Sequence, residues 1–220
     1  MRAGLFAAVL ALIAGPALAT PEYSLPTLFD VTGVAAGDTL NIRERPDASA
    51  AVIGTLAPDA TGVQVVAERS GWAQVNTAGR RGWVNSRFLR YRTDVWADGE
   101  LPQTLRCTGT EPFWGIEARG YEVVFSSPDK GERAMALRSV MDNDVPGSPL
   151  RGMIAGDDAG RMTAVIQPQI CSDGMSDHAY GLTATVIFDG ARQESSMLTG
   201  CCRIGDQAAS ADRIAASPAR

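Results

Sequence analysis

Four cysteines, all in the second half of the 220-residue chain, constrain its fold more than any other feature. Cys201 and Cys202 are adjacent, and a bridge between them would be badly strained because neighbouring Cα atoms lie only about 3.8 Å apart. Cys107 and Cys171 are therefore each expected to bond one of that pair, in an order that the sequence leaves open. Because consecutive strand residues point to opposite faces, the two bridges should leave opposite faces of one strand.

Zinc binding is the alternative use of four cysteines. The chain has no CxxC pair, and its single histidine, His178, lies in a loop apart from most of the cysteines. A structural zinc site normally has such closely spaced ligand pairs. We therefore predict two disulfides, and neither a metal nor a cofactor.

The first 19 residues are typical of a secretory signal peptide. They combine a positive start at Arg2, a short apolar run and small residues at Ala17-Leu18-Ala19. The run is shorter than the about 20 apolar residues that a membrane span needs. We expect cleavage after Ala19 and an exported protein, periplasmic or secreted, in a compartment where disulfides persist.

Charge is unevenly distributed along the chain, whose formal net charge is −5. Residues 20–92 contain 8 basic and 7 acidic residues, whereas residues 93–220 contain 11 basic and 18 acidic residues. This balance argues against nucleic acid or an anionic membrane surface as the main partner.

The first half of the chain contains short strand patterns separated by glycine turns. Leu40 and Ile42 alternate with polar residues until Pro46, and in each of two similar segments, 70–79 and 81–89, a Gly-Trp step leads into a strand. In the first of these, Ala73 and Val75 should face one side and Trp72 and Gln74 the other. Such a pattern indicates a small barrel.

These motifs resemble the bacterial Src-homology-3-like (SH3b-type) domain. The resemblance implies a five-stranded barrel over residues 30–92, in a family often attached to envelope proteins, where some members bind peptidoglycan or peptides. The residues that carry it are Leu40-Asn41-Ile42-Arg43 with Pro46, Gly54-Thr55-Leu56, Gly71-Trp72-Ala73-Gln74-Val75, and Gly82-Trp83-Val84 before Phe88-Leu89.

By position, Trp72 and Trp83 resemble the aromatic residues of a ligand groove, with Arg43 and Arg45 on or beside the first long loop. An arginine fork suits the carboxylates of an acidic peptide stem. The alternative is that both tryptophans cap the barrel, since a ring with one exposed edge serves either purpose.

The second half is expected to form an antiparallel β domain over residues 104–205, after a linker at 93–103 that contains Asp, Gly and Pro. Its eight short strands suit an up-and-down barrel or a two-layer meander. Residues 206–220 are rich in Ala and Ser and are expected to form a disordered tail. The expected strands are 104–108, 113–118, 121–126, 133–140, 150–154, 162–170, 182–189 and 193–202.

Three motifs stand out in this half, namely Cys107-Thr108-Gly109-Thr110-Glu111-Pro112-Phe113-Trp114, Cys171-Ser172-Asp173-Gly174-Met175-Ser176-Asp177 with Tyr180, and Gly200-Cys201. With these motifs, the half resembles an uncharacterised family of bacterial envelope proteins and lipoproteins. The resemblance brings no activity with it, and by analogy it implies a small lipocalin-like or other eight-stranded envelope barrel.

The segment from Cys171 to Gly181, CSDGMSDHAYG, is the best candidate for chemistry in this half. Ser176 and His178 lie two residues apart, but the chain has no G-x-S-x-G elbow, so we do not expect a hydrolase. Its acidic residues do not match a calcium-binding loop either.

Bracing of a turn is the favoured interpretation of this segment. Asp173, Ser176 and Asp177 would then cap backbone donors, while Met175 would plug one end of the barrel. The alternative is a small ligand pocket at that end, which Glu111, Trp114, Asp173 and Asp177 would line.

The sequence therefore predicts an all-β, two-domain, non-enzymatic binding protein of the cell envelope. Its first domain would contact peptidoglycan or an envelope protein. The alternative function is a small-ligand-binding or inhibitor-like protein centred on the disulfide-bonded second domain.

Overall fold

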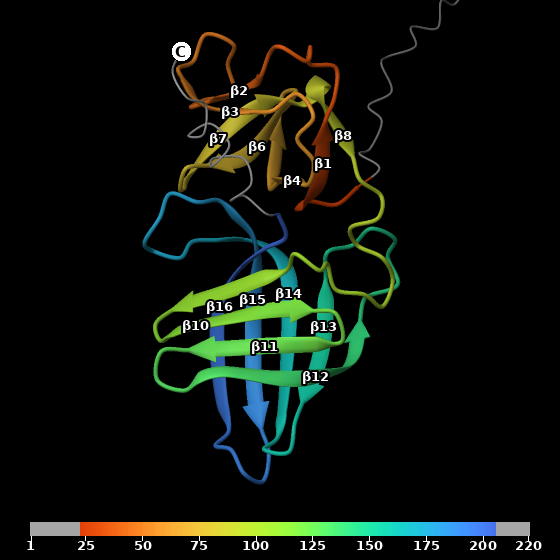
Figure 1. The fold of residues 1–220 in the computed structure, drawn as a ribbon, viewed down its shortest axis with the longest axis vertical. Coiled ribbons are helices and arrows are strands. Elements are labelled where there is room, and N and C mark those ends of the chain that lie inside the picture. The colour runs from red at the N-terminus through yellow and green to blue at the C-terminus, as the bar shows by residue number, and fades with distance from the viewer. Residues whose placement is uncertain (1–22, 206–220) are drawn as a thin grey trace, which may run out of the picture.

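A computed structural model of the chain describes residues 23–205. The predicted signal peptide, residues 1–19, and the predicted tail, residues 206–220, lie outside the described residues. The described chain is all-β apart from one 3-10 turn, η1 (Ser86–Phe88), which confirms the predicted fold class. A small domain and a closed barrel lie end to end (Figure 1).

The first domain consists of two small antiparallel sheets with one shared core. One sheet has the order β4-β1-β8, and the other has the order β3-β2-β7-β6-β5. Ala73, Val75 and Val84 are fully buried in this core, on the inward side that the alternating pattern predicted. The strands are β1 (Thr27–Val31), β2 (Leu40–Arg43), β3 (Val52–Leu56), β4 (Val63–Val65), β5 (Ala67–Arg69), β6 (Trp72–Thr77), β7 (Arg80–Asn85) and β8 (Leu89–Tyr91).

Strand β1 begins at Thr27, three residues before the expected start of the first domain. Its side chains alternate between two cores. Phe29 and Val31 pack in the first domain, whereas Leu28 belongs to the core of the second. This strand therefore helps to join the two domains.

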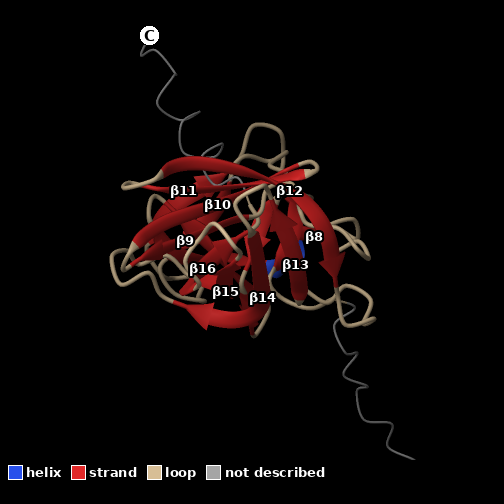
Figure 2. Cartoon of the chain, turned by 90° about the horizontal axis from the view of Figure 1, so that it is seen from below, coloured by secondary structure: helices blue, strands red, loops and turns tan. Residues whose placement is uncertain are grey.

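The second domain is a closed barrel of eight antiparallel strands in up-and-down order, and Figure 2 shows the ring of strands from below. All eight predicted strands are present, and β9 pairs with both β10 and β16, so the two-layer alternative is wrong. The strands are β9 (Arg106–Thr110), β10 (Phe113–Arg119), β11 (Glu122–Ser127), β12 (Gly131–Met141), β13 (Arg151–Gly156), β14 (Arg161–Cys171), β15 (Tyr180–Asp189) and β16 (Ser196–Arg203).

Alternation along β15 shows how the sequence fills the barrel. Leu182, Ala184 and Val186 are buried in the barrel core. Thr183 and Thr185, between them, are partly exposed on the outer wall. The period of two that predicted this strand therefore also separates its inner from its outer face.

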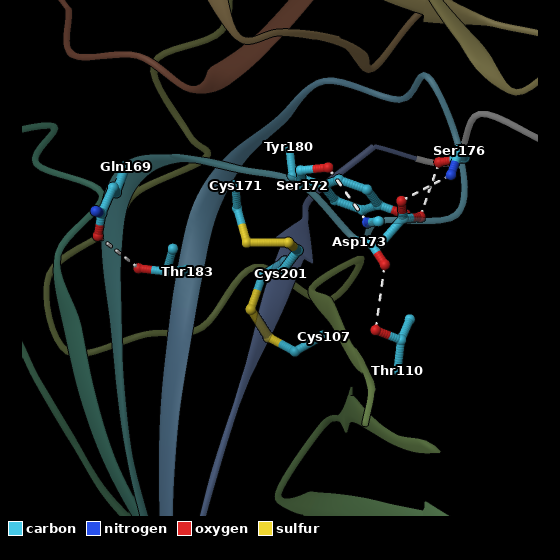
Figure 3. The surroundings of a disulfide bond; sticks show 12 residues. Cys107, Thr110, Gln169, Cys171, Ser172, Asp173, Ser176, Tyr180, Thr183 and Cys201 are labelled. Atoms are coloured by element: carbon cyan, nitrogen blue, oxygen red, sulfur yellow. Dashed lines mark hydrogen bonds between the residues drawn. A yellow bond between two sulfur atoms is a disulfide. The ribbon is translucent and has the colours of Figure 1, made fainter. Parts of the chain in front are cut away.

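The two disulfides are Cys107–Cys202 and Cys171–Cys201, and the second can be followed in Figure 3. Cys107 and Cys202 belong to the barrel core. Cys201 follows the alternation to the outer face, where it bonds Cys171 at the end of β14. The prediction of two bridges leaving opposite faces of one strand is confirmed.

The segment 93–103, expected as a linker, packs against the barrel rather than forming an exposed spacer. Its apolar residues Val95, Trp96 and Leu101 are 8%, 3% and 5% exposed and belong to the barrel core. The indole N–H of Trp96 also donates to the Pro26 carbonyl oxygen at 2.9 Å. Burial of these three side chains outweighs the local turn preference of Asp, Gly and Pro.

Further contacts hold the two domains together. The buried side-chain oxygen of Gln64 in β4 accepts hydrogen bonds from the backbone N–H groups of Ile204 and Gly205, at 2.8 and 3.2 Å. A second connection runs through residues 172–179, here called the bridging loop, which contacts the β6–β7 hairpin. Among residues 23–205, no helix is long and apolar enough to cross a membrane.

Candidate functional site

The outer face of the β6–β7 hairpin carries both tryptophans that the sequence singled out. Trp72 lies opposite Asn85, and Trp83 lies opposite Gln74, so the two rings are diagonal neighbours on one face. Both are partly exposed, and neither belongs to the core cluster of the first domain as the structure describes it. We call the surface formed by Trp72, Gln74, Trp83 and Asn85 the tryptophan face.

Arg43 of β2 borders this face directly, because it pairs with Trp83 across the sheet. Its guanidinium donates to the Ala50 carbonyl oxygen at 2.7 Å, which fixes the orientation of the side chain. Arg45 lies beyond the strand, exposed in the β2–β3 loop. Asp47 orders that loop by accepting from the Ser49 N–H at 2.8 Å and from the Ser49 hydroxyl, and these bonds lower the pKa of its carboxyl.

Asp173 organises the bridging loop in the second domain, as Figure 3 shows. One carboxylate oxygen accepts from the backbone N–H groups of Met175 and Ser176, at 3.0 and 2.9 Å. The other accepts from the Ser176 hydroxyl at 2.7 Å and the Tyr180 hydroxyl at 3.1 Å. Both oxygens are thus turned into the loop itself.

This environment shifts the pKa values of Asp173 and Tyr180. Partial burial acts to raise the pKa of Asp173, but the hydrogen bonds from Met175, Ser176 and Tyr180 outweigh it and lower that pKa to about 2. Burial, followed by the charge of Asp173, raises the pKa of the Tyr180 hydroxyl. Asp173 is therefore ionised wherever the protein is folded near neutral pH.

Ser176 and His178 do not form a nucleophile–base pair in this arrangement. The Ser176 hydroxyl donates to Asp173, and it accepts from the backbone N–H of His178 at 3.3 Å. The imidazole instead packs edge-on against Tyr180, with ring centroids 5.7 Å apart. Burial, and then the charge of Arg203, lowers the pKa of His178.

The bridging loop is tied down at both ends. The Thr110 hydroxyl donates to the Asp173 carbonyl oxygen at 3.1 Å, close to the Cys171–Cys201 bond. At the other end, the Asp177 carbonyl oxygen accepts from the Arg81 N–H at 3.0 Å. Asn76 exchanges two hydrogen bonds with the backbone of Ala179. The loop therefore joins the outer wall of the barrel to the strands of the tryptophan face.

An open groove of about 970 Å³ lies on the outer wall of the barrel, beside the first half of the bridging loop. Of the four residues expected to line a pocket here, Glu111 and Asp173 line it. Trp114 does not, because its ring is 5% exposed and stacks on Phe125 inside the barrel. Asp177 lies further along the loop, at the contact with β7.

Met175 does not plug the barrel end as expected. It is 70% exposed and lines the groove instead, because Trp114 already occupies the barrel interior at this level, against Gly109 and Gly200. A Cβ on Gly109 would lie 2.0 Å from the indole nitrogen of Trp114, so both the glycine and the buried ring are needed together.

Sequence reasoning missed the polar residues that line most of this groove. The missed residues are Thr108, Thr110, Gln167, Gln169, Thr183, Thr185 and Thr199. The Gln-x-Gln pair of β14 and the Thr-x-Thr pair of β15 could have indicated a polar outer face, because residues two apart in a strand lie on the same side. Only the barrel closure shows that these pairs lie beside β16 and β9. Within the described residues, no group of three or more His, Cys, Asp or Glu side chains is placed to hold a metal ion.

We expect Asp173→Asn to lower the free energy of unfolding by about 1–2 kcal/mol at neutral pH, because it weakens charge-assisted hydrogen bonds. The pKa of Asp173 is lower in the folded state, at about 2, than its ordinary value of 3.8. Its contribution is therefore complete above about pH 4 and disappears as the pH falls through about 2. Urea unfolding at several pH values measures the difference between variant and wild type.

The exposed Asp158 is the matched control, since Asp158→Asn removes an aspartate from a turn outside the bridging loop. Its difference from wild type should stay within about 0.5 kcal/mol. A pH-independent deficit for Asp173→Asn would contradict the assignment of the effect to the ionised carboxylate.

Comparison with known proteins identifies part of the chain. Residues 38–90 match the family model of the bacterial SH3 domain, from just before β2 into β8. No curated protein and no solved structure matches the chain. The resemblance of the second half to an envelope family remains a prediction. Residues 38–90 of the first domain, which include the tryptophan face, therefore form a bacterial SH3 domain.

Proposed function

We propose that the protein binds a cell-envelope ligand, peptidoglycan or a protein partner, through the tryptophan face of its bacterial SH3 domain. The observation that carries this proposal is that the two faces of the β6–β7 hairpin differ, one packing in the core and the other facing outward. Ala73, Val75 and Val84 fill the core, so Trp72 and Trp83 are left partly exposed on the opposite face.

The chemistry of this face suits a ligand with both apolar and acidic parts. An indole ring offers a flat apolar surface with one N–H donor at its rim. Arg43 stands next to Trp83 across the sheet, and Arg45 follows in the adjoining loop. Guanidinium groups pair well with carboxylates such as those of peptidoglycan stem peptides.

We place this function outside the cytoplasm, in the periplasm or secreted. Two disulfides and a bacterial SH3 domain are consistent with an extracytoplasmic protein. The predicted signal peptide adds to this proposal from the sequence side.

Binding rather than catalysis is proposed for the bridging loop as well. The Ser176 hydroxyl, which lies two residues before His178 in the sequence, is held by the Asp173 carboxylate instead of by the imidazole of His178. An activated serine needs a general base within hydrogen-bond reach of its hydroxyl.

Trp83→Ala is expected to weaken binding to purified peptidoglycan by about 2 kcal/mol or more, which is about thirtyfold. The reason is the loss of the ring that stands between Arg43 and Gln74 on the sheet. Co-sedimentation with insoluble peptidoglycan measures the change. Tyr121→Ala, which removes a 91% exposed ring in the second domain, is the control and should bind like wild type.

Two outcomes would contradict this assignment. A variant that stays folded, as judged by its circular dichroism, and binds peptidoglycan normally excludes Trp83 from the interface. A variant that unfolds shows that the ring supports the fold. If the wild-type protein itself fails to sediment, the same two variants are compared for crosslinking to envelope proteins, which tests the protein-partner alternative.

A further inference from the structure

We propose that the outer wall of the barrel carries a second binding site, separate from the SH3 domain, for a short neutral carbohydrate chain. The site is the groove beside the bridging loop, here called the threonine groove. Its volume of about 970 Å³ lies at the upper end of the range of about 300–1,000 Å³ seen for ligand sites. This proposal does not depend on what the SH3 domain binds.

The register of the strands places the polar side chains of the groove in rows that run across neighbouring strands. In one row Gln167, Thr183, Cys201 and Thr108 lie opposite one another across β14, β15, β16 and β9. In the next row, Thr185 lies opposite Thr199. Facing residues on neighbouring strands lie about 4.5–5.5 Å apart, so the groove offers a two-dimensional array of hydroxyl and amide groups.

Much of this hydrogen-bonding capacity is unused. The Gln169 side-chain oxygen accepts from Gln167 at 3.2 Å and from Thr183 at 3.4 Å, and the second of these bonds is visible in Figure 3. No hydrogen bond joins the hydroxyls of Thr108, Thr185 or Thr199 to another residue of the described chain, 23–205. A hydroxyl can both donate and accept, which matches the hydroxyls of a sugar.

Apolar side chains complete the groove. Phe113, at the start of β10, is 54% exposed, and Met175 of the bridging loop is 70% exposed, although both are large hydrophobic residues. The Cys171–Cys201 bond and the Thr110–Asp173 hydrogen bond hold that loop in place. An exposed aromatic face beside hydroxyl groups suits a sugar ring, which has apolar C–H faces and polar edges.

The charge of the groove excludes other ligand classes. Neither arginine nor lysine lines it, and its acidic residues are Glu111 and Asp173, the latter with its carboxylate turned into the loop. Phosphate groups and acidic chains would therefore meet no cation. Strands β14, β15, β16 and β9 are paired on both edges, so an extended peptide cannot add to the sheet by backbone hydrogen bonds.

The test is titration calorimetry of the intact, disulfide-bonded protein with two soluble trisaccharides, one of N-acetylglucosamine and one of glucose. The first represents the glycan of peptidoglycan and the second a plain polysaccharide. We expect saturable binding of at least one of them. The double variant Thr183→Val/Thr185→Val and the single variant Phe113→Ala should each weaken that binding about tenfold or more.

Controls test whether the effect belongs to the groove. Thr163→Val makes the same isosteric change on the barrel strand β14, outside the groove, and should leave affinity unchanged. Tyr121→Ala removes a 91% exposed ring of the barrel that does not line the groove, and it should also leave affinity unchanged.

Three results would overturn the proposal. The first is the absence of binding to either trisaccharide at concentrations up to about 10 mM. The second is unchanged affinity in the correctly folded Thr183→Val/Thr185→Val and Phe113→Ala variants. The third is loss of trisaccharide binding in Trp83→Ala alone, which would assign the sugar to the tryptophan face.

Discussion

Replacing both Cys107 and Cys202 with alanine should cost the protein about 4–5 kcal/mol of unfolding free energy. The two residues are 95 positions apart, so their bond removes much conformational freedom from the unfolded chain. They are also 1% and 0% exposed, and alanine leaves their place in the barrel core partly empty. A loss of this size is a large part of the about 5–15 kcal/mol that stabilises a typical domain.

The position of this bond in the barrel adds to the effect. The barrel closes where its first strand, β9, meets its last, β16, through three residue pairs, from Cys201 opposite Thr108 to Arg203 opposite Arg106. Cys107 and Cys202 face each other in the middle pair. Their bond therefore holds together the two strands that lie furthest apart in the sequence of the barrel.

Urea unfolding of the double alanine variant, combined with hydrogen exchange, measures both the size and the place of the loss. Strands β9 and β16 should lose more protection than β6 and β7, because neither disulfide reaches the SH3 domain. Cys171→Ala/Cys201→Ala is the matched comparison. Its bond spans 30 residues, and its removal should cost about 3–4 kcal/mol. A loss below about 1 kcal/mol for the first variant would show that pairing and packing alone close the barrel.

Much of the barrel could be predicted because its sequence signals are local. Leu182, Ala184 and Val186 alternate with threonines in one strand, and Asp189-Gly190 marks its end. The faces of the two disulfides followed from a single fact, that Cys201 and Cys202 are adjacent. The choice of partners did not follow, because it depends on which of Cys201 and Cys202 faces the barrel core, where Cys107 of the neighbouring strand β9 also lies.

The threonine groove and the bridging loop could not be predicted, because both depend on contacts between distant parts of the chain. Thr108 and Thr199 are 91 positions apart and become neighbours only when the barrel closes. Asp177 was considered as a ligand residue, whereas its backbone pairs with Arg80 and Arg81 of the SH3 domain. Nothing in the local sequence identifies such a partner.

The SH3 domain shows the opposite case, in which local motifs identified the family but not the whole structural unit. Several motifs, among them the Gly-Trp steps before Ala73 and Val84, indicated such a domain over residues 30–92, and residues 38–90 match the family. Strand β1 was not predicted, because its residues pack in two different cores. Leu28 and Phe29 are therefore both buried, and the sequence shows no simple alternation of apolar and polar residues.

The second large effect is expected at Arg151, a charged residue that is only 1% exposed. Its guanidinium donates to four backbone carbonyl oxygens, those of Ala97, Glu100, Ser148 and Leu150, at distances from 2.7 to 3.0 Å. It also lies over the ring of Trp96, 5.3 Å from its centroid. This side chain therefore holds the segment 93–103 against the barrel.

Arg151→Met should lower the unfolding free energy by about 3–5 kcal/mol, because methionine fills the space but leaves those carbonyl oxygens without their donors. Arg151→Lys should rescue only part of this loss, since a single ammonium group lacks the planar fork that reaches both Ala97 and Ser148. Urea unfolding measures both variants. Arg138→Met, which changes an exposed arginine of β12, is the control and should stay within about 0.5 kcal/mol.

Hydrogen exchange then locates the effect of Arg151→Met. If Arg151 holds the segment 93–103 against the barrel, backbone amides near Val95 and Leu101 should exchange faster than those of β15 in Arg151→Met. Equal and small changes at both places would contradict this role, and would mean that burial of Val95, Trp96 and Leu101 alone holds the segment. That outcome would also limit the importance of the segment for the domain contact, because Trp96 donates to Pro26 from this same stretch. A segment that detaches should instead weaken this contact and make β1 exchange faster as well.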